Sequence, residues 1–111
     1  MPHRRRAKTI SLSVQKLLAD GESDRVDFKR TPDGVTAEDF VAFANSNAGG
    51  KILIGIDEKE GPNGTQIGVV VGCDVSDEAI LKVTNKALSC IPPVAINVRT
   101  ENLTKTPFLN V

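Results

Sequence analysis

The sequence has no tryptophan or tyrosine, one histidine and two cysteines. With four phenylalanines as its only aromatic residues, it lacks the aromatic platform on which proteins stack single-stranded nucleic acids. Cys73 and Cys90 form no CxxC pair, and His3 alone cannot complete a Cys/His zinc site, so structural zinc is excluded. We expect both thiols to be reduced and partly buried.

Long apolar runs are also missing. No stretch approaches the roughly 18 residues of a membrane-spanning helix, and the basic, polar N-terminal residues contain no apolar core of a signal peptide. These absences favour a cytoplasmic protein that makes no membrane contact. A chain of 111 residues is typical of one domain that buries a core without metal or disulfide support.

The formal net charge is zero, but the charges are unevenly distributed. Four of the fourteen basic residues are Arg4, Arg5, Arg6 and Lys8, so the remainder carries ten basic and fourteen acidic side chains. This basic segment could contact nucleic-acid phosphates or could be a disordered leader, and composition leaves both alternatives open. We assign residues 1–10 to a flexible basic leader and residues 11–111 to the folded domain.

The clearest structural signal is a helix predicted from Thr36 to Asn47. Thr36 and Asp39 have the spacing of a capping box, which satisfies backbone N–H groups at a helix start. Apolar residues then recur at helical spacing, and the glycine pair at 49–50 favours the end of the helix.

A buried strand is predicted directly after this helix, from Lys51 to Asp57. Its continuous isoleucine and leucine run is typical of a strand covered on both faces. Gly55 lies inside the run, where its missing side chain would let another group approach closely. Asp57 ends the run, and taken alone such a residue is most typical of a turn.

The remaining elements alternate between helix and strand. The predicted order, helix–strand–helix–strand–strand–helix–strand–strand, indicates an α/β class, a two-layer domain in which helices pack on a mixed sheet. The other elements are a helix capped by Ser11 or Ser13, strands at 25–30, 66–71, 94–99 and 108–111, and a helix from Ser76 to Ser89 that buries Ile80, Leu81, Thr84, Ala87 and Leu88.

The AGGK segment at 48–51 raises the question of a phosphate-binding loop. The first glycine that such a loop requires falls on Asn45, and Ile52 replaces its Ser/Thr. A phosphate loop also leaves a strand and opens a helix, whereas this segment is predicted to do the reverse. We therefore expect no Walker-type ATP site.

Three acidic residues, Glu22, Asp27 and Asp57, flank or lie on two strands that we expect to be neighbours. Converging carboxylates are what Mg²⁺ or Mn²⁺ needs to activate water at a phosphodiester. Spacing alone favours ordinary solvated acids, because ideal parallel strands would separate Glu22 from Asp57 unless the chain folds back before Asp27. Lys29 could steady a phosphate or simply pair with Asp27.

Four segments together resemble the Schlafen-type AlbA-like domain, a family once catalogued as a divergent AAA ATP-binding module. They are GESDRVDFKR, AFANSNAGGKILIGIDEKEG, IGV and IPP, and the resemblance covers residues 14–111. It implies an α/β fold related to the archaeal chromatin protein Alba. Such domains are often labelled DNA-binding and are usually attached to winged-helix, helicase-like or transcriptional-regulator segments.

The resemblance also implies a catalytic possibility. In animal Schlafen proteins the related domain is a metal-dependent endoribonuclease acting on tRNA and rRNA, and its two glutamates and one aspartate correspond to Glu22, Asp27 and Asp57. Asp27 departs from the family pattern, since a glutamate usually precedes the FK motif. Relatives also continue the sheet beyond Val111, which is why we expect the chain to be part of a longer protein.

These observations predict a DNA- or structured-RNA-binding module of a larger bacterial, archaeal or phage regulatory protein. The expected phosphate contacts are Arg4, Arg5, Arg6, Lys8 and Lys29. The first alternative is a Schlafen-type endoribonuclease that holds Mg²⁺ or Mn²⁺ at the three acidic residues. The second is a ligand-sensing or dimerisation domain, which near-neutral charge and the lack of stacking aromatics favour. A homo-oligomer is compatible with each.

Overall fold

The computed structural model describes residues 5–6, 8–45, 49–90, 92–102 and 105–111. Within these ranges the helices are α1 (Leu12–Asp20), α2 (Ala37–Ala44) and α3 (Asp77–Leu88). The strands are β1 (Arg5–Arg6), β2 (Val26–Lys29), β3 (Lys51–Ile54), β4 (Ile56–Glu60), β5 (Gln66–Val70), β6 (Arg99–Glu101) and β7 (Phe108–Asn110). Two short 3₁₀ turns, at Pro32–Gly34 and Pro62–Gly64, lie in connections.

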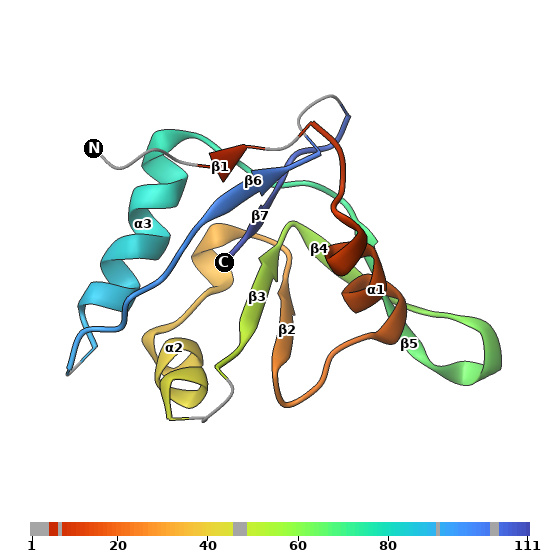
Figure 1. Ribbon diagram of the computed structural model, residues 1–111, viewed down its shortest axis with the longest axis horizontal. Coiled ribbons are helices and arrows are strands. Elements are labelled where there is room, and N and C mark those ends of the chain that lie inside the picture. Colours follow the sequence, from red (N-terminus) through yellow and green to blue (C-terminus); the bar gives the residue numbers. More distant parts are fainter. Residues whose placement is uncertain (1–4, 7, 46–48, 91, 103–104) are drawn as a thin grey trace.

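A mixed five-stranded sheet forms the centre of the domain, with the strand order β1-β6-β7-β3-β2 (Figure 1). β2 runs parallel to β3, and β7 lies antiparallel to both β3 and β6. β4 and β5 form a separate antiparallel ribbon. The mixed sheet with helices packed on it confirms the predicted α/β class and the predicted order of elements.

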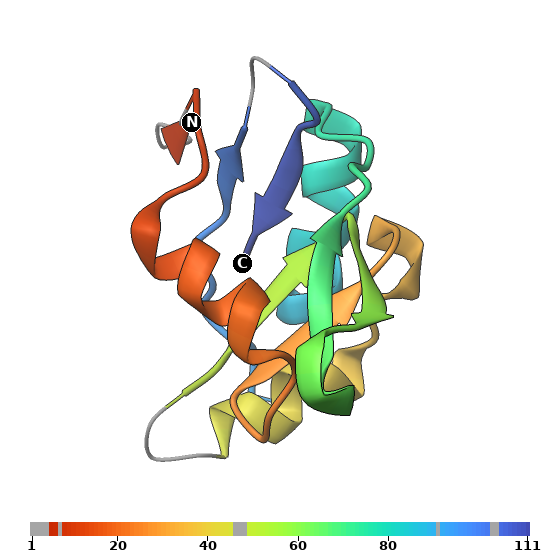
Figure 2. The same cartoon turned by 90° about the vertical axis from the view of Figure 1, so that its right-hand side faces the viewer.

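The two faces of the sheet carry two separate apolar clusters. Ile52 and Ile54 of β3 pack with residues of α2 and α3, whereas Leu53 packs on the other face with Val14 and Leu18 of α1. All three β3 side chains are at most 2% exposed, which confirms that this strand is covered on both faces. Figures 1 and 2 show α1 and α3 on opposite sides of the sheet, with the β4–β5 ribbon beside α1.

Gly55 breaks the strand that was predicted as continuous from Lys51 to Asp57. Its φ of +101° turns the chain out of β3 and into β4, and its carbonyl accepts hydrogen bonds from the N–H groups of Val71 at 2.8 Å and Gly72 at 2.9 Å. A Cβ at this position would lie 2.9 Å from the Gly72 carbonyl carbon. The predicted close approach at Gly55 is therefore confirmed, and it comes from the backbone after β5.

The helices begin where their caps predict. Ser11 and Ser76 accept backbone hydrogen bonds at the starts of α1 and α3, and the predicted Thr36–Asp39 capping box is present in α2. α2 ends at Ala44, and Asn47 lies outside the described residues. No helix in the described ranges is long and apolar enough to span a bilayer.

Two sequence predictions need correction. The buried stripe of α3 consists of Ala79, Ile80, Val83 and Ala87, while Leu81 and Leu88 are 56% and 57% exposed, because the helix presents a face rotated from the one predicted. The strand predicted over 94–99 is paired only from Arg99 onward, as β6.

The two cysteines are free thiols, with Cys90 buried and Cys73 partly buried. Burial raises the pKa of Cys73 to about 11, and its Sγ donates a hydrogen bond to the Ile54 carbonyl at 3.3 Å. Cys73 is therefore a protonated packing residue at neutral pH rather than a reactive thiolate.

Candidate functional site

The predicted acidic site begins at a reversal of the chain just before β2. Ser23 and Val26 exchange backbone hydrogen bonds of 3.0 and 3.4 Å and form an antiparallel bridge. The reversal lets Glu22 Oε2 accept a hydrogen bond from the Phe28 N–H at 2.9 Å. Since β2 is an edge strand, this N–H has no neighbouring strand, and Glu22 supplies its acceptor. The chain thus folds back before Asp27, as a shared acidic site requires.

Glu22 lies near enough to Asp27 to affect the pKa of the Asp27 carboxyl group. Burial raises the pKa of Asp27, and a side-chain hydrogen bond with Glu22 raises it further, whereas hydrogen bonding and ion pairing with Lys29 lower it. The net direction is upward, as expected when two carboxyl groups share a partly buried site. These two residues form the acidic pair of the site.

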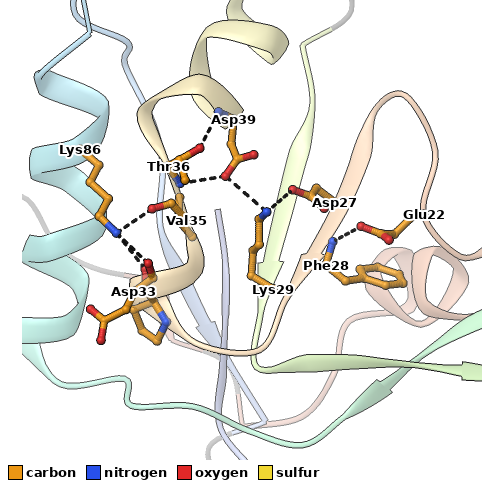
Figure 3. Close-up of polar contacts among 10 residues, drawn as sticks. Glu22, Asp27, Phe28, Lys29, Asp33, Val35, Thr36, Asp39 and Lys86 are labelled. Atoms are coloured by element: carbon orange, nitrogen blue, oxygen red, sulfur yellow. Dashed lines mark hydrogen bonds and ion pairs between the residues drawn. The ribbon is translucent and has the colours of Figure 1, made fainter.

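Lys29 lies between two carboxylates (Figure 3). Its Nζ is 3.2 Å from Asp27 and 3.5 Å from Asp39, and its side chain is 25% exposed. Burial lowers the pKa of Lys29, but the two carboxylates outweigh this effect and raise the pKa overall. Lys29 therefore holds its charge and links β2 to the first turn of α2.

Asp39 is a site residue that sequence reasoning assigned only to helix capping. Its Oδ2 accepts the Thr36 N–H at 2.8 Å, and the same oxygen is the one that faces Lys29. The capping-box pattern fixed its position, but pairing with Lys29 depends on how α2 packs on the sheet. The spacing of the two residues carried no signal for that contact.

Asp57 does not join the acidic pair. After the bend at Gly55 it lies on β4, where its Oδ2 is 3.7 Å from Arg30 and its Oδ1 accepts the Glu58 N–H at 2.9 Å. Within the described part of the chain, no three His, Cys, Asp or Glu side chains are grouped closely enough to hold a metal ion. The structure thus brings together two of the three predicted ligands, and the shared metal site stays a prediction.

Lys86 secures the connection between β2 and α2 (Figure 3). Its Nζ donates to the carbonyl oxygens of Pro32, Asp33 and Val35 at 3.4, 3.2 and 2.6 Å. This lysine on α3 therefore holds the loop that separates Lys29 from Asp39. Sequence reasoning missed it, because backbone carbonyl partners leave no pattern in the side chains.

The other predicted phosphate contacts lie near the N-terminus. Arg4 lies outside the described residues, and so do the side chains of Arg5 and Arg6, whose backbone forms β1 parallel to β6. Lys8 is exposed. Binding of phosphates by these residues stays a prediction.

Comparison with known families now identifies the domain. The family model described as Schlafen, AlbA_2 matches residues 22–111. The chain belongs to this family. The match begins at Glu22, so the Schlafen AlbA_2 region of the chain contains all three acidic residues, Lys29 and Asp39. A search of curated proteins gave no match.

A solved structure has a similar fold. It is the solution NMR structure of the N-terminal domain of an ATP-dependent DNA helicase RecG-related protein from Nitrosomonas europaea, with a TM-score of 0.66 and 21% sequence identity. The alignment covers 89% of this Schlafen AlbA_2 chain and 66% of the other chain. The likeness supports the fold assignment.

Proposed function

We propose that this Schlafen AlbA_2 domain is a nucleic-acid-binding module of a larger regulatory protein. The observation that carries the proposal is family membership across residues 22–111. The similar domain from a DNA helicase-related protein supports the same class of ligand. DNA and structured RNA are both candidates, because the domain offers charge and shape but no row of stacking aromatics.

The end of β2 offers two cations for phosphate contacts. Lys29 is paired with Asp27 and Asp39, and the 67%-exposed Arg30 is paired with Asp57. On binding a phosphate at this position, Lys29 and Arg30 would exchange their carboxylate partners for phosphate oxygens. The planar guanidinium group matches the geometry of a phosphate, which favours Arg30 for that exchange. Binding of this kind depends on two cations at one place rather than on the charge of the whole chain, which agrees with a net charge of zero.

Fluorescence anisotropy with an RNA hairpin, a DNA duplex and a single strand of DNA tests the proposal. Arg30→Gln should weaken binding roughly fivefold, corresponding to about 1 kcal/mol for a lost charge-assisted contact. Lys16→Gln is the matched control, since Lys16 is also an exposed cation in a surface ion pair, with Asp20. Absence of binding to all three probes would contradict the proposal and favour a ligand-sensing or dimerisation domain.

A second candidate function is metal-dependent endoribonuclease activity. The reversal at Ser23 favours it, because it places Glu22 beside β2, where Glu22 Oε2 accepts the Phe28 N–H at 2.9 Å next to Asp27. Paired carboxyl oxygens are suitable donors for Mg²⁺ or Mn²⁺, and these two residues would hold the ion. Asp57 would join them only by leaving Arg30. When bound, the ion would activate water at a phosphodiester, and Lys29 would stabilise negative charge on the phosphate.

A further inference from the structure

The N-terminal segment is joined to the edge of the sheet. We call its described residues, 5–6 and 8–11, the basic arm. Within it, β1 pairs in parallel with residues 99–100 of β6, and Figure 1 shows β1 beside β6 at the sheet edge. Strands in proteins usually have three or more residues, so this short pairing alone is a weak hold. The arm therefore needs a further anchor.

Glu101, the residue after this pairing, supplies an anchor. Its Oε1 accepts a hydrogen bond from the Ser11 N–H at 2.9 Å, and its Oε2 accepts one from Asn110 Nδ2 at 2.7 Å. Arg99 Nε lies 3.8 Å from Oε2 and supplies the opposite charge. The Glu101 side chain is fully buried, and a carboxylate is stable in such a place only with partners of this kind. Glu101 thus fixes the residue at which the arm enters α1.

The partners of Glu101 are themselves held in place. Lys51 fixes the orientation of the Asn110 amide, because its Nζ donates to Asn110 Oδ1 at 3.0 Å. The polar contacts therefore run from β3 across β7 and β6 to the start of α1. Ile10 adds an apolar anchor, since it is partly buried and packs against the cluster on the α1 face of the sheet. These contacts act on the end of the arm next to α1, whereas β1 holds the other end.

We propose that Glu101 is a positioning residue for nucleic-acid binding. It holds the basic arm on the sheet, so that Arg5, Arg6 and Lys8 meet phosphates from a fixed backbone rather than from a flexible leader. The inference rests on the proposed function, in which these cations contact nucleic acid. A segment that is ordered before binding loses less conformational freedom when it binds, and its affinity is higher for that reason.

Two substitutions at Ser11 isolate the bond to Glu101. Both Ser11→Pro and Ser11→Ala remove the hydroxyl that caps α1, where it accepts the Val14 N–H. Only proline also removes the N–H that Glu101 accepts. Proline adopts the Ser11 φ of −63° without strain, and neither substitution changes the net charge. The difference between the two variants therefore measures the anchor.

Trypsin cleavage after Lys8 measures release of the arm without nucleic acid, because a protease cuts chain that opens locally. Ser11→Pro should speed this cleavage about tenfold relative to Ser11→Ala, while cleavage after Lys86 on α3 should be equal in both. Fluorescence anisotropy with a DNA duplex should show roughly fivefold weaker binding by Ser11→Pro at every salt concentration. The salt slope should be the same in both variants, because a released arm keeps its cations and displaces the same counterions.

An exchange of hydrogen-bonding groups supplies an independent readout. Glu101→Gln leaves one acceptor for two donors, so it should release the arm as Ser11→Pro does. Adding Asn110→Asp returns the missing acceptor and places the carboxylate beside Lys51 and Arg99. The double variant should therefore restore slow cleavage after Lys8. Each pair of variants decides the question if a member of the other fails to fold.

Equal cleavage after Lys8 in the two Ser11 variants would overturn the proposal, and so would faster cleavage without loss of affinity. A smaller salt slope for Ser11→Pro would also overturn it, because it would show a lost phosphate contact rather than lost order. Absence of duplex binding by the wild type would instead contradict the proposed function, and the positioning role would fall with it.

Discussion

Replacement of Gly55 by alanine should destabilise the domain by about 3 kcal/mol or more. The φ of +101° is strained for any residue with a side chain. The new Cβ would also meet the Gly72 carbonyl carbon at 2.9 Å and Phe108 Cβ at 3.0 Å. Both neighbours are held in place, since Gly72 donates its N–H to Gly55 and Phe108 is fully buried, so neither can move aside cheaply.

Gly49→Ala is the matched control for this prediction. Gly49 also has a positive φ, of +70°, but among the residues that the structure describes a Cβ there would meet nothing within 4 Å. Gly49→Ala should lower the free energy of unfolding by only about 1 kcal/mol, which is the strain of a left-handed residue with a side chain. Urea unfolding of both variants measures the difference, and equal losses of stability would show that close packing at the bend contributes nothing.

Mn²⁺ should raise the melting temperature of the wild-type domain by roughly 5 °C at ten times its dissociation constant. Carboxylates brought together repel one another unless a cation neutralises them. The proposed ion would join Asp57, which pairs with Arg30 in the structure, to Glu22 and Asp27, which only the folded chain brings near one another. Asp57→Asn should remove the metal-dependent increase, because it takes away one of the three proposed charged ligands.

Asp20→Asn is the control for the metal experiment, since Asp20 is likewise an exposed carboxylate paired with a cation, Lys16. It should leave the Mn²⁺ effect unchanged. Identical melting curves for wild type and Asp57→Asn, each with and without Mn²⁺, would leave Asp57 as the ion-pair partner of Arg30 and remove the basis for the endoribonuclease candidate.

Local signals in the sequence predicted much of the fold. The caps at Ser11, Thr36 and Ser76 locate the helix starts, because side-chain acceptors for backbone N–H groups act within one turn. The alternation of Val26 and Phe28 with Asp27 and Lys29 predicted which side of β2 is buried. Such patterns need only neighbouring residues, which is why sequence reasoning recovers them.

Features that depend on distant contacts were missed. The apolar run from Ile52 to Ile56 does not reveal the bend at Gly55, since the bend is stabilised by N–H groups after β5. The site shows the same limit: the meeting of Glu22 with Asp27 needs the reversal at Ser23, and Lys86 reaches its carbonyl partners from α3. Tertiary packing sets these positions.

The salt dependence of nucleic-acid binding tests the central proposal most directly. For wild type and a variant with Arg4, Arg5, Arg6 and Lys8 replaced by glutamine, affinity for a DNA duplex and an RNA hairpin would be measured across a salt series. Substitution is preferable to deletion, because the backbone of Arg5 and Arg6 forms β1. We predict that the wild type binds, that its affinity falls linearly with salt on logarithmic axes, and that the variant loses roughly three to four released counterions on duplex DNA. No binding at low salt, or binding independent of salt, would contradict the account.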